Sequence, residues 1–396
     1  MAKHQNYSGG SVTGWAAGAK NQIGCTVTPA GSRGVSMKMP GLFIVLLALA
    51  AMPGAEGQTI NHPLPSASKD AKSGPAVGAP IPKFQAMDAM GKPQTFESLR
   101  GPKGLVLAFS RSADWCPYCK TQLVDLNGQV EAFRQKGFAV AALTCDSKEV
   151  LADFALRQKL KYTLLSDPDS TVIRAFDILN QNVEPGNMAY GIPFPGTYIV
   201  NERGIVTAKY YEEDYRERYS AAGILTREFG GEGIAKTTID NPQLTLSYSA
   251  TDSLVAPGRR ITLIVDVTPK PKMHLYAPGV QGYIPVDWQM AQSKAWALLP
   301  VVYPPSRMLN LPVINETVPV FDTPVRIVRD VIIGQESELA GAMNPSRELT
   351  IEGTFRYQAC DDKECYIPKT LQLTWMFKVG QLETDRVPLE LRRSPK

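Results

Sequence analysis

The sequence lacks several features that would place it in common functional classes. Its 396 residues carry a net charge of only +4 and no dense block of lysine and arginine, so nothing points to a nucleic-acid partner. Its three histidines, His4, His62 and His274, are scattered, which disfavours zinc bound by a cysteine pair and further ligands. Six cysteines are too few for a disulfide-stapled scaffold and instead fit a few redox-active thiols in domains held by their cores.

Long hydrophobic runs are also scarce. The apolar run at residues 42–51 is too short to span a bilayer and is typical of the core of a signal peptide. Small residues follow it, so we expect cleavage after Ala55 or Gly57, with Met37 or Met39 as the real start. We therefore expect a signal peptide around residues 37–57 and an exported, periplasmic or otherwise extracytoplasmic mature protein. An uncleaved membrane anchor is the alternative.

The patterning predicts two globular domains after an amino-terminal extension and signal peptide at residues 1–57. Residues 58–77 are rich in proline, serine and alanine and are typical of a linker. Residues 78–228 alternate apolar runs with helical periodicity, which indicates an α/β fold with a mostly parallel sheet. Apolar residues occupy every second position in much of 240–380, which indicates an all-β sandwich. Residues 381–396 are charged and are expected to form a loose tail.

The sequence of the first domain predicts its individual strands and helices. The expected strands are residues 104–109, 138–144, 162–165, 196–200 and 205–211, and the expected helices are one that starts at a CxxC motif, 149–160 and 170–176. The first helix has a buried stripe at Leu123, Leu126, Val130 and Phe133. The glycine-containing segment 227–240 is expected to link the two domains.

Four cysteines form two closely spaced pairs, each able to open and close a disulfide. Cys116 and Cys119 form the CxxC between a predicted strand and a predicted helix, where backbone N–H groups and the helix dipole favour a thiolate. We expect Cys116 to be the exposed attacking nucleophile and the more buried Cys119 to resolve the mixed disulfide. Pro117 suits the first helical turn because its missing N–H is not needed there, and Arg111 is a candidate source of positive potential. Cys145, at a strand end, is expected to be a core residue.

The first domain resembles a known family. The motif Trp115-Cys-x-x-Cys-Lys, a preceding strand and a later Pro-x-Thr-Tyr-Ile-Val resemble the thioredoxin fold, most closely its redoxin branch of TlpA-like and AhpC/TSA proteins, over about residues 77–225. The resemblance implies a cis proline that faces the CxxC, for which Pro195 is the first match and Pro193 the second. Peroxiredoxins carry a threonine three residues before the reactive cysteine, where this chain has Ala113, so thiol–disulfide exchange is favoured over peroxide reduction. Ser110 stands where thioredoxin has a buried aspartate.

Cys360 and Cys365 lie between two strands of the predicted sandwich, where a turn can bring the Cα atoms to the ~5.5 Å separation of a disulfide. These residues alone fit a structural disulfide and a redox centre equally well. Tyr357-x-x-Cys…Cys-Tyr366-x-Pro resembles the amino-terminal periplasmic domain of the thiol:disulfide interchange protein DsbD, over about residues 244–379. The resemblance implies an immunoglobulin-like domain whose cysteine pair passes electrons to periplasmic proteins. It also implies a cap loop, near residues 311–316.

These observations predict an exported thiol–disulfide oxidoreductase, with a reductase favoured. Electrons would move between Cys116/Cys119, Cys360/Cys365 and oxidised or reduced periplasmic proteins, with a membrane electron carrier as a further partner. No cofactor beyond the cysteine pairs is expected. A thiol peroxidase of the AhpC/TSA type is the first alternative. A non-enzymatic module that binds a partner and uses the second pair as a structural disulfide is the other.

Overall fold

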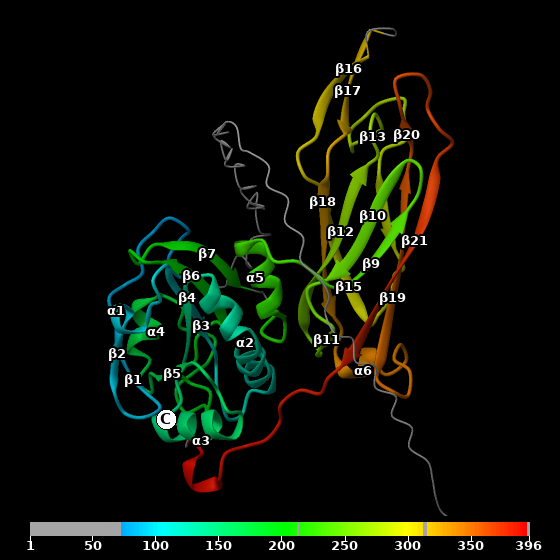
Figure 1. Ribbon diagram of the computed structural model, residues 1–396. Coiled ribbons are helices and arrows are strands. Elements are labelled where there is room, and N and C mark those ends of the chain that lie inside the picture. Colours follow the sequence, from blue (N-terminus) through cyan, green and yellow to red (C-terminus); the bar gives the residue numbers. More distant parts are fainter. Residues whose placement is uncertain (1–72, 212–213, 312–314, 394–396) are drawn as a thin grey trace, which may run out of the picture. The chain divides into compact units, whose positions relative to one another are not determined.

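The computed structural model describes residues 73–211, 214–311 and 315–393 (Figure 1). The expected signal peptide and most of the expected linker at 58–77 lie outside these ranges. The described residues belong to one compact unit. None of their helices is long and apolar enough to cross a membrane.

The first domain is built on a seven-stranded sheet with the order β2-β1-β5-β4-β3-β6-β7. The central strands β3, β4 and β5 are parallel, as their continuous apolar runs predict, because both faces of the sheet are covered by helices. The strands are β1 (Gln85–Asp88), β2 (Pro93–Thr95), β3 (Gly104–Phe109), β4 (Phe138–Thr144), β5 (Thr163–Ser166), β6 (Gly196–Asn201) and β7 (Val206–Tyr211).

Helices cover the two faces of this sheet unequally (Figure 1). Alternate residues of β3 point to opposite faces, so Leu107 packs with α1 and α4 whereas Val106 packs with α2, α3 and α5. The helices are α1 (Phe96–Leu99), α2 (Pro117–Gln135), α3 (Lys148–Arg157), α4 (Thr171–Ala175) and α5 (Ala221–Phe229). The stripe Leu123, Leu126, Val130 and Phe133 is buried in the second of these layers, as predicted. The fold is thioredoxin-like.

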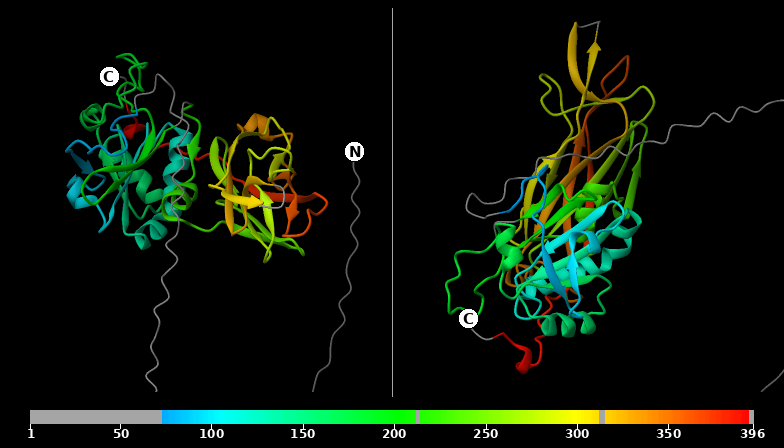
Figure 2. Two further views of the ribbon diagram at one scale, coloured as in Figure 1. Left: turned by 90° about the horizontal axis from the view of Figure 1, so that it is seen from above. Right: turned by 90° about the vertical axis from the view of Figure 1, so that its left-hand side faces the viewer.

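The second domain is a β-sandwich, whose strands lie in two facing layers in Figure 2. One sheet has the order β15-β18-β12-β10-β9 and the other β11-β21-β19-β14. Their strands are β9 (Ile234–Asp240), β10 (Leu244–Ala250), β11 (Leu254–Val255), β12 (Arg259–Pro269), β14 (Asp287–Met290), β15 (Trp296–Val302), β18 (Val325–Ile333), β19 (Glu348–Tyr357) and β21 (Lys369–Val379). The period-two residues of β12 and β21 meet in one core, as their alternation predicts. Helix α6 (Glu336–Leu339) is short.

A third, four-stranded sheet carries the second cysteine pair. Its order is β16-β17-β13-β20, and its strands are β16 (Arg307–Leu311), β17 (Glu316–Phe321), β13 (His274–Tyr276) and β20 (Ala359–Cys360). Strand β13 pairs with β20 on one side and β17 on the other. The cysteine pair therefore lies against a sheet that is separate from the two large ones.

The prediction of a linker at residues 227–240 is wrong, because most of these residues belong to a helix and a strand. Helix α5 continues to Phe229 and ends at Gly230, whose φ of +68° suits a helix C-terminus. Strand β9 then begins at Ile234 and pairs along β10. Most side chains of β9 are exposed, so the strand has no apolar alternation, and its backbone hydrogen bonds leave no pattern in the sequence.

The expected loose tail is also wrong. After β21, the chain returns to the first domain and binds there through hydrogen bonds from residues 383–393, which include a one-turn 3-10 helix, η1 (Leu389–Leu391). Val387 is fully buried. The charged residues that suggested a solvated tail instead pair with buried groups, of which Asp114 is one.

Candidate functional site

The first cysteine pair lies where β3 passes into α2. Cys116 is the N-cap of α2, and its sulfur accepts a hydrogen bond from the backbone N–H of Cys119 at 3.3 Å. Pro117 occupies the first helical turn, as its missing N–H predicts. The two cysteines form a disulfide with a Cα–Cα distance of 5.3 Å. Unpaired N–H groups at this helix end favour negative charge, so the site stabilises a thiolate when the disulfide opens.

A buried carboxylate holds the loop that precedes Cys116. Asp146, just after β4, accepts hydrogen bonds from the hydroxyl of Ser112 at 2.8 Å and from the backbone N–H of Ala113 at 2.6 Å. Burial raises the pKa of Asp146, and these hydrogen bonds offset part of that rise. The hydroxyl of Ser110 is buried without a hydrogen-bond partner. The loop is thus fixed by a side chain from the neighbouring strand.

Two arginines flank the disulfide. Nη2 of Arg111 lies 3.5 Å from Sγ of Cys116, and its guanidinium stacks on the rings of Tyr215 at 3.8 Å and Trp115 at 5.3 Å. Nη2 of Arg218, in β8 (Arg218–Tyr219), lies 3.9 Å from Sγ of Cys119. The sequence identified Arg111 but not Arg218, because Arg218 is distant along the chain and no local pattern marks it.

Two expectations about this pair are wrong. Cys116 is 0% exposed rather than the exposed member of the pair, because the guanidinium of Arg111 lies against its sulfur and is itself stacked under Tyr215. Pro195 is trans, since the described residues contain no cis peptide bond. The trans isomer is the lower-energy form of a bond that precedes proline. The N–H of the preceding residue, Phe194, donates to the carbonyl of Ile178 at 2.7 Å.

The second cysteine pair is also a disulfide. Cys360 and Cys365 have a Cα–Cα distance of 4.0 Å. The hydroxyl of Tyr276, in β13, lies 3.4 Å from Sγ of Cys360 and 3.5 Å from Sγ of Cys365. Cys360 is buried, whereas Cys365 is exposed. An incoming thiol therefore meets the sulfur of Cys365 first.

Apolar and aromatic side chains cover Cys360. Val318 and Val320 of β17 pack against it, and Tyr283 stacks on Tyr276 with a centroid distance of 4.3 Å. Strand β17, which pairs with β16, supplies part of this cover. Residues 312–314 of the expected cap loop at 311–316 lie outside the described ranges.

The two tyrosines expected to support the second pair have different positions. The hydroxyl of Tyr366 donates to Asp361 at 2.9 Å, and its N–H donates to the carbonyl of Ala359 at 2.9 Å, so Tyr366 closes the loop between the cysteines. The hydroxyl of Tyr357 donates to Gln243 at 3.1 Å within the sandwich core. Tyr276, which contacts both sulfurs, was not predicted, because it lies far from the cysteine pair in the sequence.

The remaining described cysteine, Cys145, is 1% exposed, which confirms the prediction of a core residue. Burial raises the pKa of its thiol to about 12, so it stays protonated near neutral pH. The described ranges contain no group of three His, Cys, Asp or Glu side chains arranged to hold a metal ion.

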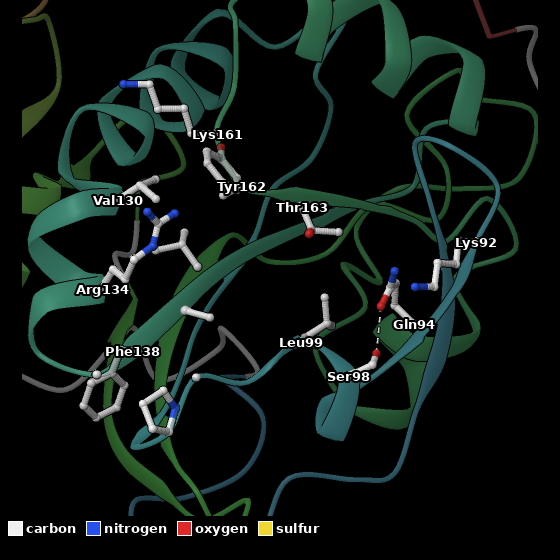
Figure 3. A pocket seen from close by; sticks show the side chains of 15 residues that line it. Lys92, Gln94, Ser98, Leu99, Val130, Arg134, Phe138, Lys161, Tyr162 and Thr163 are labelled. Atoms are coloured by element: carbon white, nitrogen blue, oxygen red, sulfur yellow. Dashed lines mark hydrogen bonds between the residues drawn. The ribbon is translucent and has the colours of Figure 1, made fainter.

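A cavity of about 420 Å³ opens elsewhere in the first domain (Figure 3). Lys92, Arg134 and Lys161 are among the residues that line it, together with Gln94 and Ser98, which share a hydrogen bond. Neither cysteine pair lines this cavity.

Comparisons with known proteins match each domain separately. The AhpC/TSA family matches residues 77–209, and the family described as thiol:disulfide interchange protein DsbD, N-terminal, matches residues 242–375. A protein of Mycobacterium tuberculosis named as a peroxiredoxin is 31% identical over 134 residues, which are 34% of this chain and 83% of that protein. Peroxiredoxin Q from chloroplasts of Sedum lineare is 27% identical over 142 residues, 36% of this chain and 72% of that protein.

A solved structure is also similar to part of this chain. The crystal structure of peroxidoxin BcpB from Mycobacterium tuberculosis aligns with 35% of this chain and 88% of that one, at 21% identity and a TM-score of 0.32.

Proposed function

Because this chain belongs to the AhpC/TSA family and also carries a domain of the DsbD amino-terminal family, it is a thiol-based oxidoreductase, and we propose that it reduces disulfides in other proteins outside the cytoplasm. The observation that carries the proposal is the disulfide of Cys116 and Cys119 at the start of α2, with Arg111 at 3.5 Å. A helix amino terminus and a guanidinium favour the thiolate that attacks a disulfide.

The proposed reaction at the first pair is dithiol–disulfide exchange. The thiolate of Cys116 attacks one sulfur of the substrate disulfide, and the other substrate sulfur leaves as a thiolate that takes up a proton. The thiol of Cys119 loses its proton and attacks Cys116 in the mixed disulfide, which releases the second substrate thiol. The substrate gains two electrons and two protons, and the enzyme ends with the Cys116–Cys119 disulfide. Trp115 and Pro195 are proposed to line this site.

The second pair is proposed to be a further redox centre in the same electron flow. Cys365 is its exposed sulfur, and the hydroxyl of Tyr276 lies within hydrogen-bond reach of both sulfurs. Tyr357 and Tyr366 are proposed to support the strand and the loop that hold the pair. Its partners are redox proteins with exchangeable thiols, and a membrane electron carrier is the proposed source of electrons.

The length of strand β12 indicates how far apart the two cysteine pairs lie. Arg259, at its start, pairs with β8 of the first domain, whereas His274, which follows its other end, pairs with Cys360. A strand of 11 residues covers about 33 Å at roughly 3.3 Å per residue. We therefore propose that electrons pass between the two pairs through a partner protein or a second copy of the chain.

The domain boundaries and the location belong to the proposal as well. We propose that the first domain, expected at residues 78–228, ends with α5 at Phe229 and that the sandwich, expected at 240–380, begins with β9 at Ile234. A signal peptide around residues 37–57 is also part of the proposal. The match of residues 242–375 to the DsbD amino-terminal family supports a periplasmic location. Disulfides persist in such oxidising compartments.

Peroxide reduction is the second candidate function, because relatives of the first domain are named as peroxiredoxins. The side chain three residues before Cys116 is the methyl group of Ala113, which offers no hydroxyl to a peroxide. Peroxide consumption by the reduced protein separates the two functions. A reductase consumes peroxide slowly and reduces a protein disulfide quickly, and a peroxidase does the reverse.

A redox titration tests the proposal directly. The chain from Gln58 onward is equilibrated in glutathione buffers, and each pair is followed by thiol trapping and mass spectrometry. We expect both pairs to titrate reversibly between about −120 and −300 mV, the range of known exchange proteins. If Cys360–Cys365 stays oxidised below that range, the second pair is a structural disulfide. If Cys116–Cys119 does so, the proposed exchange reaction is wrong.

A further inference from the structure

The end of the chain binds to residues that flank the first cysteine pair in the sequence. The N–H of Glu383 donates to the hydroxyl of Thr121 at 2.9 Å, and its carboxylate accepts from the amide of Gln158 at 2.7 Å. The ammonium of Lys120, a residue with 0% exposure, donates to the backbone carbonyl of Asp385 at 2.6 Å. These contacts reach the first turn of α2 immediately after Cys119.

The same segment also binds immediately before the pair. The guanidinium of Arg386 donates two hydrogen bonds of 2.6 Å to the two carboxylate oxygens of Asp114, which is 2% exposed. The N–H of Val387 donates to the same carboxylate at 3.0 Å, and the side chain of Val387 is fully buried. Further on, Arg393 donates to Sγ of Cys145 at 2.8 Å and to the carbonyl of Tyr190 at 2.6 Å.

These contacts bracket the disulfide. Asp114 stands two residues before Cys116 and Lys120 one residue after Cys119, so residues 385–387 contact the residues that flank the CxxC motif. Cys116 is buried in this state under the guanidinium of Arg111, which stands in the same loop as Asp114, so a protein disulfide cannot come into line with its sulfur. A partner reaches the sulfur only after the covering groups move.

We propose that residues 383–393 are a built-in occupant of the surface on which a partner polypeptide docks to reach Cys116. This inference rests on the proposed exchange function and adds the kind of partner that the surface accepts. Contacts with side chains of the first domain hold the segment in place, because residues 381–388 form no helix or strand of their own. Segments of this kind open at a lower free-energy cost than core strands.

The buried charges define what the partner supplies. When the segment leaves, the ammonium of Lys120 and the carboxylate of Asp114 lose the partners described above and have only water in their place. A docking polypeptide restores both if it is extended and places a backbone carbonyl over Lys120 and a guanidinium over Asp114. The surface therefore fits a segment with an arginine followed by an apolar residue, as in Arg386 and Val387.

The test measures how fast Cys116 becomes accessible. The full chain is reduced and then treated with a bulky maleimide polymer that reacts with accessible thiols. Mass spectrometry measures the rate at which Cys116 is labelled. Arg386→Glu places a negative charge against Asp114, so we expect labelling at least about tenfold faster than in the unmodified chain. The matched control is Arg356→Glu, an exposed residue of β19, for which we expect an unchanged rate.

A second variant and a peptide complete the design. Val387→Asp removes the buried anchor of the segment without altering the first domain, and we expect the same acceleration. A synthetic peptide of residues 383–393, added in excess, should restore slow labelling in Val387→Asp. Equal labelling rates in all variants, or lower thermal stability with an unchanged rate, would show that the segment is a structural fastening and would overturn the proposal.

Labelling does not depend on exchange activity, so the two proposals fail separately. If Arg386→Glu is labelled faster but no protein disulfide is reduced, the proposal for residues 383–393 is supported and the exchange function is refuted. Reduction of a protein disulfide at equal rates in Arg386→Glu and in the unmodified chain refutes the occupant alone.

Discussion

At the scale of single residues, the two disulfides differ in the polar side chains that lie against their sulfur atoms. Arg111 and Arg218 bring positive charge to within 3.5 Å and 3.9 Å of the first pair. The second pair instead has the neutral hydroxyl of Tyr276. A guanidinium stabilises a thiolate through its full charge, whereas a phenol stabilises it through one hydrogen bond. We therefore expect the first pair to be the faster nucleophile and the second to depend on Tyr276.

The role of Tyr276 gives a prediction. Burial raises the pKa of Tyr276 to about 12, so the hydroxyl keeps its proton and can donate to the sulfur that leaves when the disulfide opens. Tyr276→Phe removes this hydrogen bond, and we expect reduction of Cys360–Cys365 by dithiothreitol to slow by about three- to tenfold. Quenched-flow thiol trapping measures the rate.

Tyr283→Phe is the control for this prediction. The hydroxyl of Tyr283 donates to Glu316 at 2.7 Å, and its ring stacks on Tyr276, so its loss perturbs the same cover without removing a donor to sulfur. An equal slowing in both variants would mean that packing, and not the Tyr276 hydroxyl, controls the reaction.

At the scale of elements, the sequence predicts what local patterns encode. Strands β3 and β4 match the predicted bounds residue for residue, because a buried parallel strand is a continuous apolar run between breaks. Exposed β9 and the contacts of residues 383–393 were missed, since backbone pairing and long-range ion pairs leave no periodicity. The candidate site divides in the same way. The cysteines come from motifs, whereas Arg218 and Tyr276 reach them only through the tertiary fold.

The junction of β3 and β6 shows how closely these elements are packed. Gly104 begins β3 with a φ of +146°, and a Cβ built on it would lie 2.0 Å from the carbonyl oxygen of Val200. We expect Gly104→Ala to lower the free energy of unfolding by roughly 2–4 kcal/mol, because the side chain can fit only if β3 and β6 separate. Urea unfolding measures the change.

The matched variant is Gly128→Ala, inside α2, where an added Cβ meets no atom within 4 Å. Alanine is the better helix former, so we expect this variant to gain up to about 1 kcal/mol. A loss of stability at Gly128, or none at Gly104, would contradict the packing described for this sheet.

At the scale of the whole molecule, buried charges connect the first domain to the sandwich. Arg259, at the start of β12, forms an ion pair with Asp125 of α2. Arg227 of α5 pairs with Asp330 of β18. Arg386, beyond the sandwich, pairs with Asp114. Breaking a buried pair leaves an uncompensated charge, so this junction is sensitive to the protonation of its acids.

Asp252 makes that sensitivity measurable. Its buried carboxylate accepts from the hydroxyls of Ser220 at 2.7 Å and Thr251 at 2.6 Å, and burial, together with the negative charge of Asp125, raises its pKa to about 6. A carboxyl whose pKa is higher in the folded state than in the unfolded state stabilises the fold when protonated. Its contribution is complete below the unfolded pKa of 3.8 and is lost as pH rises through about 6.

Asp252→Asn keeps the shape of the protonated carboxyl and removes its titration. We expect the variant to gain stability relative to the unmodified chain as pH rises from about 4 to 7, by an amount near 3 kcal/mol for a shift of roughly two pKa units. Urea unfolding of both proteins across this range gives the difference, in which the other titrating groups cancel. A difference that stays constant with pH would mean that Asp252 is ionised throughout. In that case Arg259, which lowers its pKa, outweighs burial at this junction.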